Sequence, residues 1–201
     1  SRLHMKRSIV RDCEAVDAGG AVYAENGGIL VMEDSTIESN KAKWGGAVAA
    51  LSGAKIVLKF GTTSYVKGNT ATDKGGGFNL NDANLDVSGQ NTKLVVKENA
   101  AKTSKGGGLI ANTGAVITVS NGAQMNVTKN TAIDAGGFFL GKKGTRLDVV
   151  GKDTKLFVVA NIAKNDGGGV WIRGGPVFSV SSGATVACER NSAGVTGGCL
   201  L

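Results

Sequence analysis

Apolar and polar residues alternate along most of this chain, and the alternation recurs at intervals of about 30 residues. In the stretch 84–88, Leu85 and Val87 stand between Asn84, Asp86 and Ser88, so every second side chain is apolar. This spacing is typical of a strand with one buried face, whereas an amphipathic helix would show a spacing of about 3.6 residues. The pattern therefore predicts a chain built from short strands.

Each repeat contains an Asn, an Ala two residues later, and a pair of glycines before the next apolar stretch. Asn130 and Ala132, followed by Gly136 and Gly137, show the unit. The first glycines of the successive pairs are Gly19, Gly45, Gly75, Gly106, Gly136, Gly167 and Gly197. A period in this range is typical of a solenoid, in which each repeat buries its apolar face against its neighbours.

Three apolar stretches recur in each repeat: one after the glycine pair, one in the middle, and one leading into the Asn. Stacking of these stretches predicts an all-β, right-handed parallel β-helix of about six to seven coils, with three short strands per coil. Residues 1–5 resemble a cloning remnant. We therefore expect a single β-helix repeat domain over 6–201, as a fragment of a longer protein.

The Asn column has a structural interpretation. Side-chain amides stacked coil on coil can hydrogen-bond to one another and to the turn backbone. The predicted ladder consists of Asn40, Asn69, Asn99, Asn130, Asn161 and Asn191. We expect these residues to hold the corners of the coils and to take no part in chemistry.

The motifs at these two corners resemble a known family. The stretches 19–22 and 45–48 read Gly-Gly-Ala-Val, and 37–40 and 66–69 read apolar-x-x-Asn. This pairing is similar to the repeats of chlamydial polymorphic outer membrane proteins and to autotransporter passenger domains of the pectin-lyase-like class, although Val, Ile or Cys stands where that family has Phe. The resemblance implies an extracellular or cell-surface protein that adheres to a partner.

The net charge of +7 includes a basic stretch at Lys93, Lys97, Lys102 and Lys105 and a second at residues 142–143. Such charge can attract anionic glycans, lipids or nucleic acid. It can also be a solvated surface that keeps sheets from pairing, which we favour because the basic residues do not gather in one repeat column. We predict no specific nucleic-acid binding and no transmembrane segment, since no apolar run approaches 18 residues.

Candidate catalytic residues are few. Asp86 and Asp148 are expected to lie two coils apart in one outward column, roughly 9–10 Å from each other, with Arg146 nearby to orient a sugar acid. The alternative is that all three are ordinary solvent-facing residues, which we favour. Three Cys make neither a disulfide framework nor a metal signature, and Asp17, Asp73 and Asp134 fit turn residues better than calcium ligands. We predict no catalytic site, no metal and no cofactor.

One surface strip has no charged residue. The outward positions after the glycine pairs are small or apolar, and the largest of them are Tyr23, Ile110, Phe138, Leu140 and Trp171. A flat apolar strip of this kind indicates a contact surface for a protein or glycan, or for self-association. Two other interpretations stay open: a flanking segment covers the strip, or the inward and outward positions are exchanged.

These observations predict a non-enzymatic, surface-exposed scaffold or adhesion module that binds a protein or glycan through this strip. A polysaccharide-acting lyase or hydrolase of the pectin-lyase-like class is one alternative. A purely structural spacer array is the other.

Overall fold

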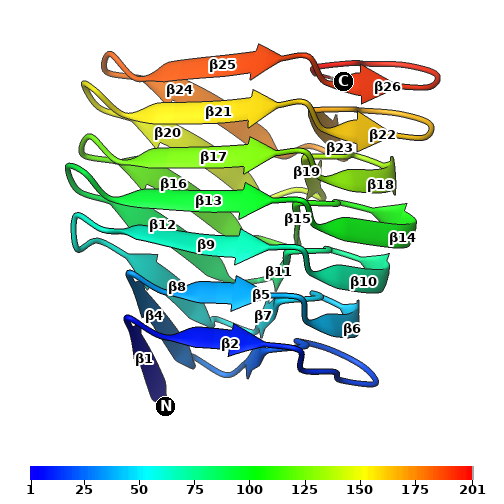
Figure 1. The fold of residues 1–201 in the computed structure, drawn as a ribbon. Coiled ribbons are helices and arrows are strands. Elements are labelled where there is room, and N and C mark those ends of the chain that lie inside the picture. The colour runs from blue at the N-terminus through cyan, green and yellow to red at the C-terminus, as the bar shows by residue number, and fades with distance from the viewer. Residues whose placement is uncertain (201) are drawn as a thin grey trace.

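The computed structural model describes residues 1–200, and residue 201 lies outside them. The described chain consists of short parallel strands without a helix, stacked as successive coils along one axis (Figure 1). The predicted all-β solenoid is therefore confirmed. The coils form four sheets, here named A to D in the order in which the chain passes through them after β3, with sheet A first.

Sheet A carries the mid-repeat strands and sheet B the strands that lead into the Asn. Sheet A contains β1 (Arg2–Lys6), β4 (Ile29–Glu33), β8 (Lys55–Leu58), β12 (Asn84–Ser88), β16 (Val116–Ser120), β20 (Arg146–Val150) and β24 (Val177–Ser181). Sheet B contains β2 (Ile9–Arg11), β5 (Thr36–Glu38), β9 (Thr63–Lys67), β13 (Lys93–Lys97), β17 (Gln124–Thr128), β21 (Lys155–Val159) and β25 (Thr185–Glu189).

Sheet C follows the Asn and sheet D follows the glycine pair. Sheet C contains β6 (Lys41–Trp44), β10 (Thr70–Lys74), β14 (Ala100–Lys105), β18 (Thr131–Asp134), β22 (Ile162–Ala163) and β26 (Ser192–Ala193). Sheet D contains β3 (Val22–Ala24), β7 (Val48–Leu51), β11 (Phe78–Asn81), β15 (Leu109–Asn112), β19 (Phe138–Gly141) and β23 (Val170–Arg173).

Sheet C is a correction to the prediction of three strands per coil. Its strands lack apolar alternation, and their register is broken, for example between Ala101 and Lys105. They pair because each coil places one extended segment directly on the equivalent segment of the next coil. Backbone groups then hydrogen-bond whatever the side chains are.

The core lies inside the coils. It is formed by the inward residues of sheets A, B and D, with Leu85, Val96 and Phe78 as one such set, and the Ala column of sheet C closes one corner. Residues 2–5, expected outside the domain, belong to β1, which pairs with β4 and buries Met5. The sheet therefore begins before the predicted domain boundary at residue 6.

The Asn column forms a continuous ladder along one corner. From Asn69 to Asn191, the Oδ1 of each Asn accepts hydrogen bonds of 2.9–3.0 Å from the backbone N–H and the Nδ2 of the preceding Asn, beginning with Asn40. At its end, Cys188 and Cys199 form a disulfide, a pairing that the sequence did not indicate.

Candidate functional site

The outward side chains of sheet D form a single column along the axis. From one coil to the next, the residues paired across adjacent strands in this column are Tyr23, Ala49, Asn79, Ile110, Phe139 and Trp171. The three largest apolar members, Ile110, Phe139 and Trp171, form a second hydrophobic cluster together with Ala135, separate from the main core. Sheet D therefore carries an apolar outer face, as the sequence predicts, but with different members and a different shape.

The first difference concerns Phe138 and Leu140, which were expected on the outer face. Both are fully buried in the main core, and Phe139 takes the outward position. The reason is the corner before β19, where Ala135 has a positive φ of 54° at the place that Gly106 (φ 73°) and Gly167 (φ 65°) occupy in the adjacent coils. The corner thus begins one residue before Gly136. Because of this shift, the residues of β19 expected to face outward face the core, and Phe139, expected to face the core, faces outward.

The second difference concerns exposure. Tyr23 is 50% exposed, whereas Ile110, Phe139 and Trp171 are 1%, 6% and 9% exposed. The chain folds back over this column where sheet C turns into sheet D. A Cβ added to Gly167 would lie 2.6 Å from Trp171 Cβ, which shows how closely the corner approaches the column. Of the predicted strip, Ile110 lies on the floor of a hollow, whereas Tyr23 is exposed outside it.

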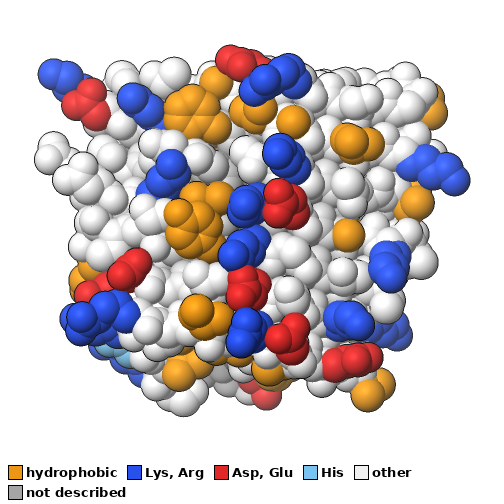
Figure 2. Space-filling model, in the orientation of Figure 1, with side chains coloured by type: hydrophobic (Ala, Val, Ile, Leu, Met, Phe, Trp, Pro, Cys, Tyr) orange, Lys and Arg blue, Asp and Glu red, His pale blue; other side chains and the backbone are white. Residues whose placement is uncertain are grey.

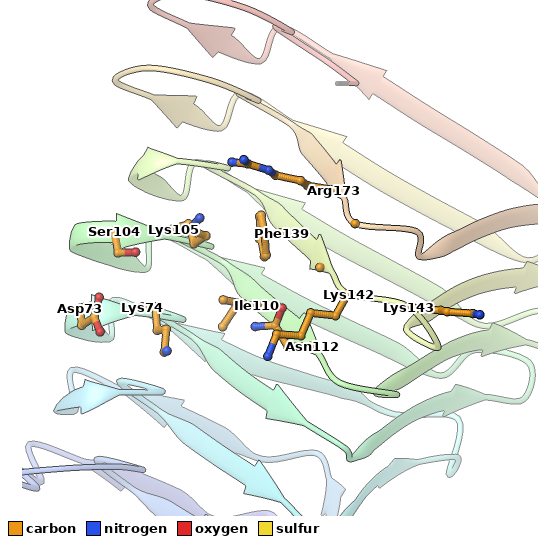
Figure 3. A pocket seen from close by; sticks show the side chains of 12 residues that line it. Asp73, Lys74, Ser104, Lys105, Ile110, Asn112, Phe139, Lys142, Lys143 and Arg173 are labelled. Carbon is orange, nitrogen blue, oxygen red and sulfur yellow. The ribbon is translucent and has the colours of Figure 1, made fainter.

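This hollow, here called the sheet D groove, has a volume of about 610 Å³. Ile110 and Phe139 line its floor. Asp73, Lys74, Ser104 and Lys105 of sheet C line one wall, and Asn112, Lys142 and Arg173 line the other (Figure 3). Lys142 and Arg173 extend toward sheet C, whereas Lys143 points away (Figure 3).

Aromatic rings hold two of the cations in place. Phe139 and Trp171 meet edge to face with their ring centroids 5.4 Å apart. Lys105 Nζ lies 4.6 Å from the Phe139 centroid and 5.0 Å from that of Trp171, and Arg173 Cζ lies 5.8 Å from the Trp171 centroid. The sequence had singled out Lys105 within a basic stretch, but alternation alone could not place it over sheet D.

A smaller hollow of about 260 Å³ adjoins the groove and shares Lys74, Asn112 and Lys142 with it. Trp44 lines this hollow. Its Nε1–H donates a hydrogen bond of 2.9 Å to Asp73 Oδ2, and Lys74 Nζ lies 5.3 Å from its ring centroid. Trp44 therefore lines the smaller hollow, and Trp171 lies beside Lys105 and Arg173 of the groove.

The acidic candidates lie elsewhere, on the outer face of sheet A. Asp86, Thr118 and Asp148 occupy one column in adjacent register, as expected from the sequence. Arg146 donates two hydrogen bonds of 3.1 Å to Asp148, and Ser179 Oγ donates a third of 2.5 Å. Burial alone would raise the pKa of Asp148, but these hydrogen bonds and the Arg146 charge outweigh it, so the pKa lies below the ordinary value. A carboxylate held in this way has no proton to give as a general acid at neutral pH.

We expect Asp148→Asn to lower the free energy of unfolding by about 1 kcal/mol at neutral pH, since a partly exposed ion pair contributes little. The folded-state pKa of Asp148 is depressed, so its contribution is present above the ordinary value of 3.8 and is lost as the pH falls through the folded-state pKa. Denaturant unfolding of both proteins at neutral pH and well below pH 3.8 measures the difference. A difference that persists in acid would contradict this assignment.

Within residues 1–200, no three His, Cys, Asp or Glu side chains gather closely enough to hold a metal ion. The same residues include no helix of the length and hydropathy that a membrane span requires.

The comparisons with known proteins agree with the geometry. A family model described as a right-handed β-helix region matches residues 4–175, and it supports the predicted hand. Neither the curated proteins nor the solved structures contain a match to this chain.

Proposed function

Because the chain belongs to the right-handed β-helix family, we propose that it is a non-enzymatic scaffold that binds a protein or glycan partner in the sheet D groove. The observation that carries this proposal is the apolar cluster of Ile110, Phe139 and Trp171 outside the solenoid core. A spacer array needs only polar residues on an outer face. A concave surface with an apolar floor and a few polar groups is typical of a binding site.

Two observations support a place outside the cell or on its surface. The Gly-Gly-Ala-Val and apolar-x-x-Asn motifs resemble those of surface-exposed chlamydial and autotransporter proteins. The disulfide between Cys188 and Cys199 is of a kind that persists in oxidising compartments. A partner of the groove is then expected at a cell surface or in the surrounding matrix.

The polysaccharide-acting alternative would use Asp86, Asp148 and Arg146 on sheet A. These residues line no part of the sheet D groove. The ion pair with Arg146 and the hydrogen bond from Ser179 occupy both oxygens of Asp148. No observation favours catalysis over binding.

A blocking label tests the groove. In a Cys13→Ser background, which removes the exposed free thiol, Ser104→Cys is labelled with a bulky uncharged maleimide, so that the label fills the groove. The matched control is Thr72→Cys with the same label, because Thr72 lines a separate hollow away from the groove. Both proteins are applied to immobilised glycans, neutral and anionic, and to extracellular matrix proteins.

We expect the label on the Ser104→Cys variant to abolish retention and the label on the Thr72→Cys variant to leave it unchanged. Equal retention of both labelled proteins would place the contact elsewhere. Failure of the unlabelled protein to bind anything would favour the spacer. Release of oligosaccharides that Asp148→Asn abolishes would establish the enzyme instead.

A further inference from the structure

We infer that the ligand of the sheet D groove is an anionic glycan, a saccharide chain that carries carboxylate or sulfate groups. This inference rests on the proposed function and specifies the chemistry of its partner. It is carried by the cations of the groove, by the rings that position them, and by the neutral polar groups between them.

The cations that face the groove have no acidic partner. Among residues 1–200, no carboxylate lies within 4.0 Å of the terminal nitrogens of Lys74, Lys105, Lys142 or Arg173. The only acid in the lining, Asp73, accepts the Trp44 Nε1–H. Four cations facing the groove against one carboxylate leave a local charge of +3, and a hollow with low-dielectric walls concentrates such a field.

The front face of the molecule differs in this respect. Figure 2 shows Lys and Arg side chains interspersed with Asp and Glu over sheet B. There Lys67 pairs with Glu38 at 2.8 Å and Lys97 with Glu98 at 3.7 Å. Two cations of sheet B therefore have an acidic partner, whereas the four cations that face the groove share one hollow and have none.

The aromatic rings restrain two of these cations in positions where they can bind an anion. Lys105 stands over Phe139 and Trp171, and Arg173 flanks Trp171 on the following coil. A cation–π contact restrains the position of the charge without neutralising it, and the N–H groups that point away from the ring have no partner there. The ammonium and guanidinium donors are then free for charge-assisted hydrogen bonds to a carboxylate or sulfate oxygen.

The four cations lie on successive coils along the axis of the β-helix. Lys74 and Lys105 end adjacent strands of sheet C, β10 and β14. On the facing wall, Lys142 follows β19 and Arg173 ends β23, which are adjacent strands of sheet D. Adjacent coils are separated by about 4.8 Å, so the charges are spaced for a linear polymer with repeated anionic groups.

The remaining groups favour a saccharide over other polyanions. Asn112 and Ser104 in the groove can donate to and accept from sugar hydroxyls. Single-stranded nucleic acid binds through exposed ring faces, but Phe139 and Trp171 are almost fully covered. An extended peptide needs a free strand edge, but β15 and β19 are paired on both sides.

Tryptophan fluorescence gives a direct measurement, because the chain contains two Trp, one in the adjoining hollow and one beside Lys105 and Arg173. The full chain is titrated with carboxymethyl dextran, dextran sulfate and unmodified dextran, which share one backbone, and with poly-glutamate. We expect saturable, salt-sensitive binding of the carboxylated dextran, the sulfated dextran or both. Which of them binds more tightly identifies the anionic group.

The variant Lys105→Gln/Arg173→Gln is expected to raise the Kd by about tenfold or more, since each residue loses a charge-assisted contact. The matched control is Lys152→Gln/Lys155→Gln, which removes the same charge from two exposed positions, one in the turn after β20 and one at the start of β21. We expect the control to stay within about twofold of the parent protein, because surface charges remote from the groove act only through screened fields. Circular dichroism and thermal unfolding establish that both variants fold.

Equal weakening in the two double variants would overturn the inference, because binding would then follow net charge alone. Equal affinity for poly-glutamate would also overturn it, in favour of an acidic peptide. Binding of unmodified dextran as tight as that of the charged forms would refute the anionic ligand but leave the groove as a binding site. If a panel partner is displaced by the label on the Ser104→Cys variant but not affected by Lys105→Gln/Arg173→Gln, this inference fails while the proposed function stands.

Discussion

Replacement of Asn130 by Leu is expected to lower the free energy of unfolding by on the order of 4 kcal/mol. Asn130 is fully buried. Its Oδ1 accepts from the backbone N–H and the Nδ2 of Asn99, and its Nδ2 donates to Val96 O and to Asn161 Oδ1. Leu has a similar volume but fills none of these roles, so buried donors on Asn99 lose their acceptor.

Denaturant unfolding measures this effect, and Asn126→Leu is the control. Asn126 lies in the same coil on the outer face of β17, where it accepts a hydrogen bond only from Gln124. We expect the control to change stability by less than about 0.5 kcal/mol, as for most surface substitutions. If Asn130→Leu were as mild as Asn126→Leu, the ladder would contribute little to the stability of the solenoid.

The second large effect is expected for Phe138→Ala, which should cost about 4 kcal/mol because it opens a cavity in the main core. Phe138 is fully buried between the inward residues Leu109 and Val170 of the neighbouring coils. Phe139→Ala is the matched variant, one residue along the same strand. It removes a ring from the small outer cluster, so we expect about half the loss of stability.

The two variants also separate folding from binding. Phe139→Ala should weaken ligand binding in the sheet D groove, because Lys105 loses the ring that restrains its ammonium. Phe138→Ala should leave the affinity of the folded protein close to that of the parent. Measured stabilities in the reverse order would mean that Phe138 faces outward, as the glycine pair at residues 136–137 had indicated.

The glycine pair predicted the wrong orientation of Phe138 and Phe139 for a physical reason. The corner requires one residue with positive φ, which Gly adopts readily and Ala adopts at a cost of roughly 1–2 kcal/mol. Ala135 nevertheless takes the position. In return, Phe138 enters the main core and the Ala135 methyl packs with Ile110, Phe139 and Trp171. Packing of whole side chains outweighed a local backbone preference.

The groove was not predictable for a related reason. Alternation along one strand shows which side chains face away from the core, as it did for Ile110 and Trp171. It does not show whether another part of the chain then covers them. The covering of the outward side chains of sheet D depends on sheet C, whose strands vary in length from two residues in β22 to six residues in β14. The longest of them carries Lys105 over Phe139.

The sequence by itself determined the all-β class, the parallel coils, the inward columns and the position of the Asn ladder. Each of these depends on contacts between equivalent residues of adjacent repeats, so a period in the sequence becomes a contact in space. Only the tertiary structure decided the fourth sheet, the phase of β19, the covering of the outer face of sheet D and the pairing of Asp148 with Arg146 and Ser179. These features depend on the lengths of the corners and on packing between different columns, which no repeat period records.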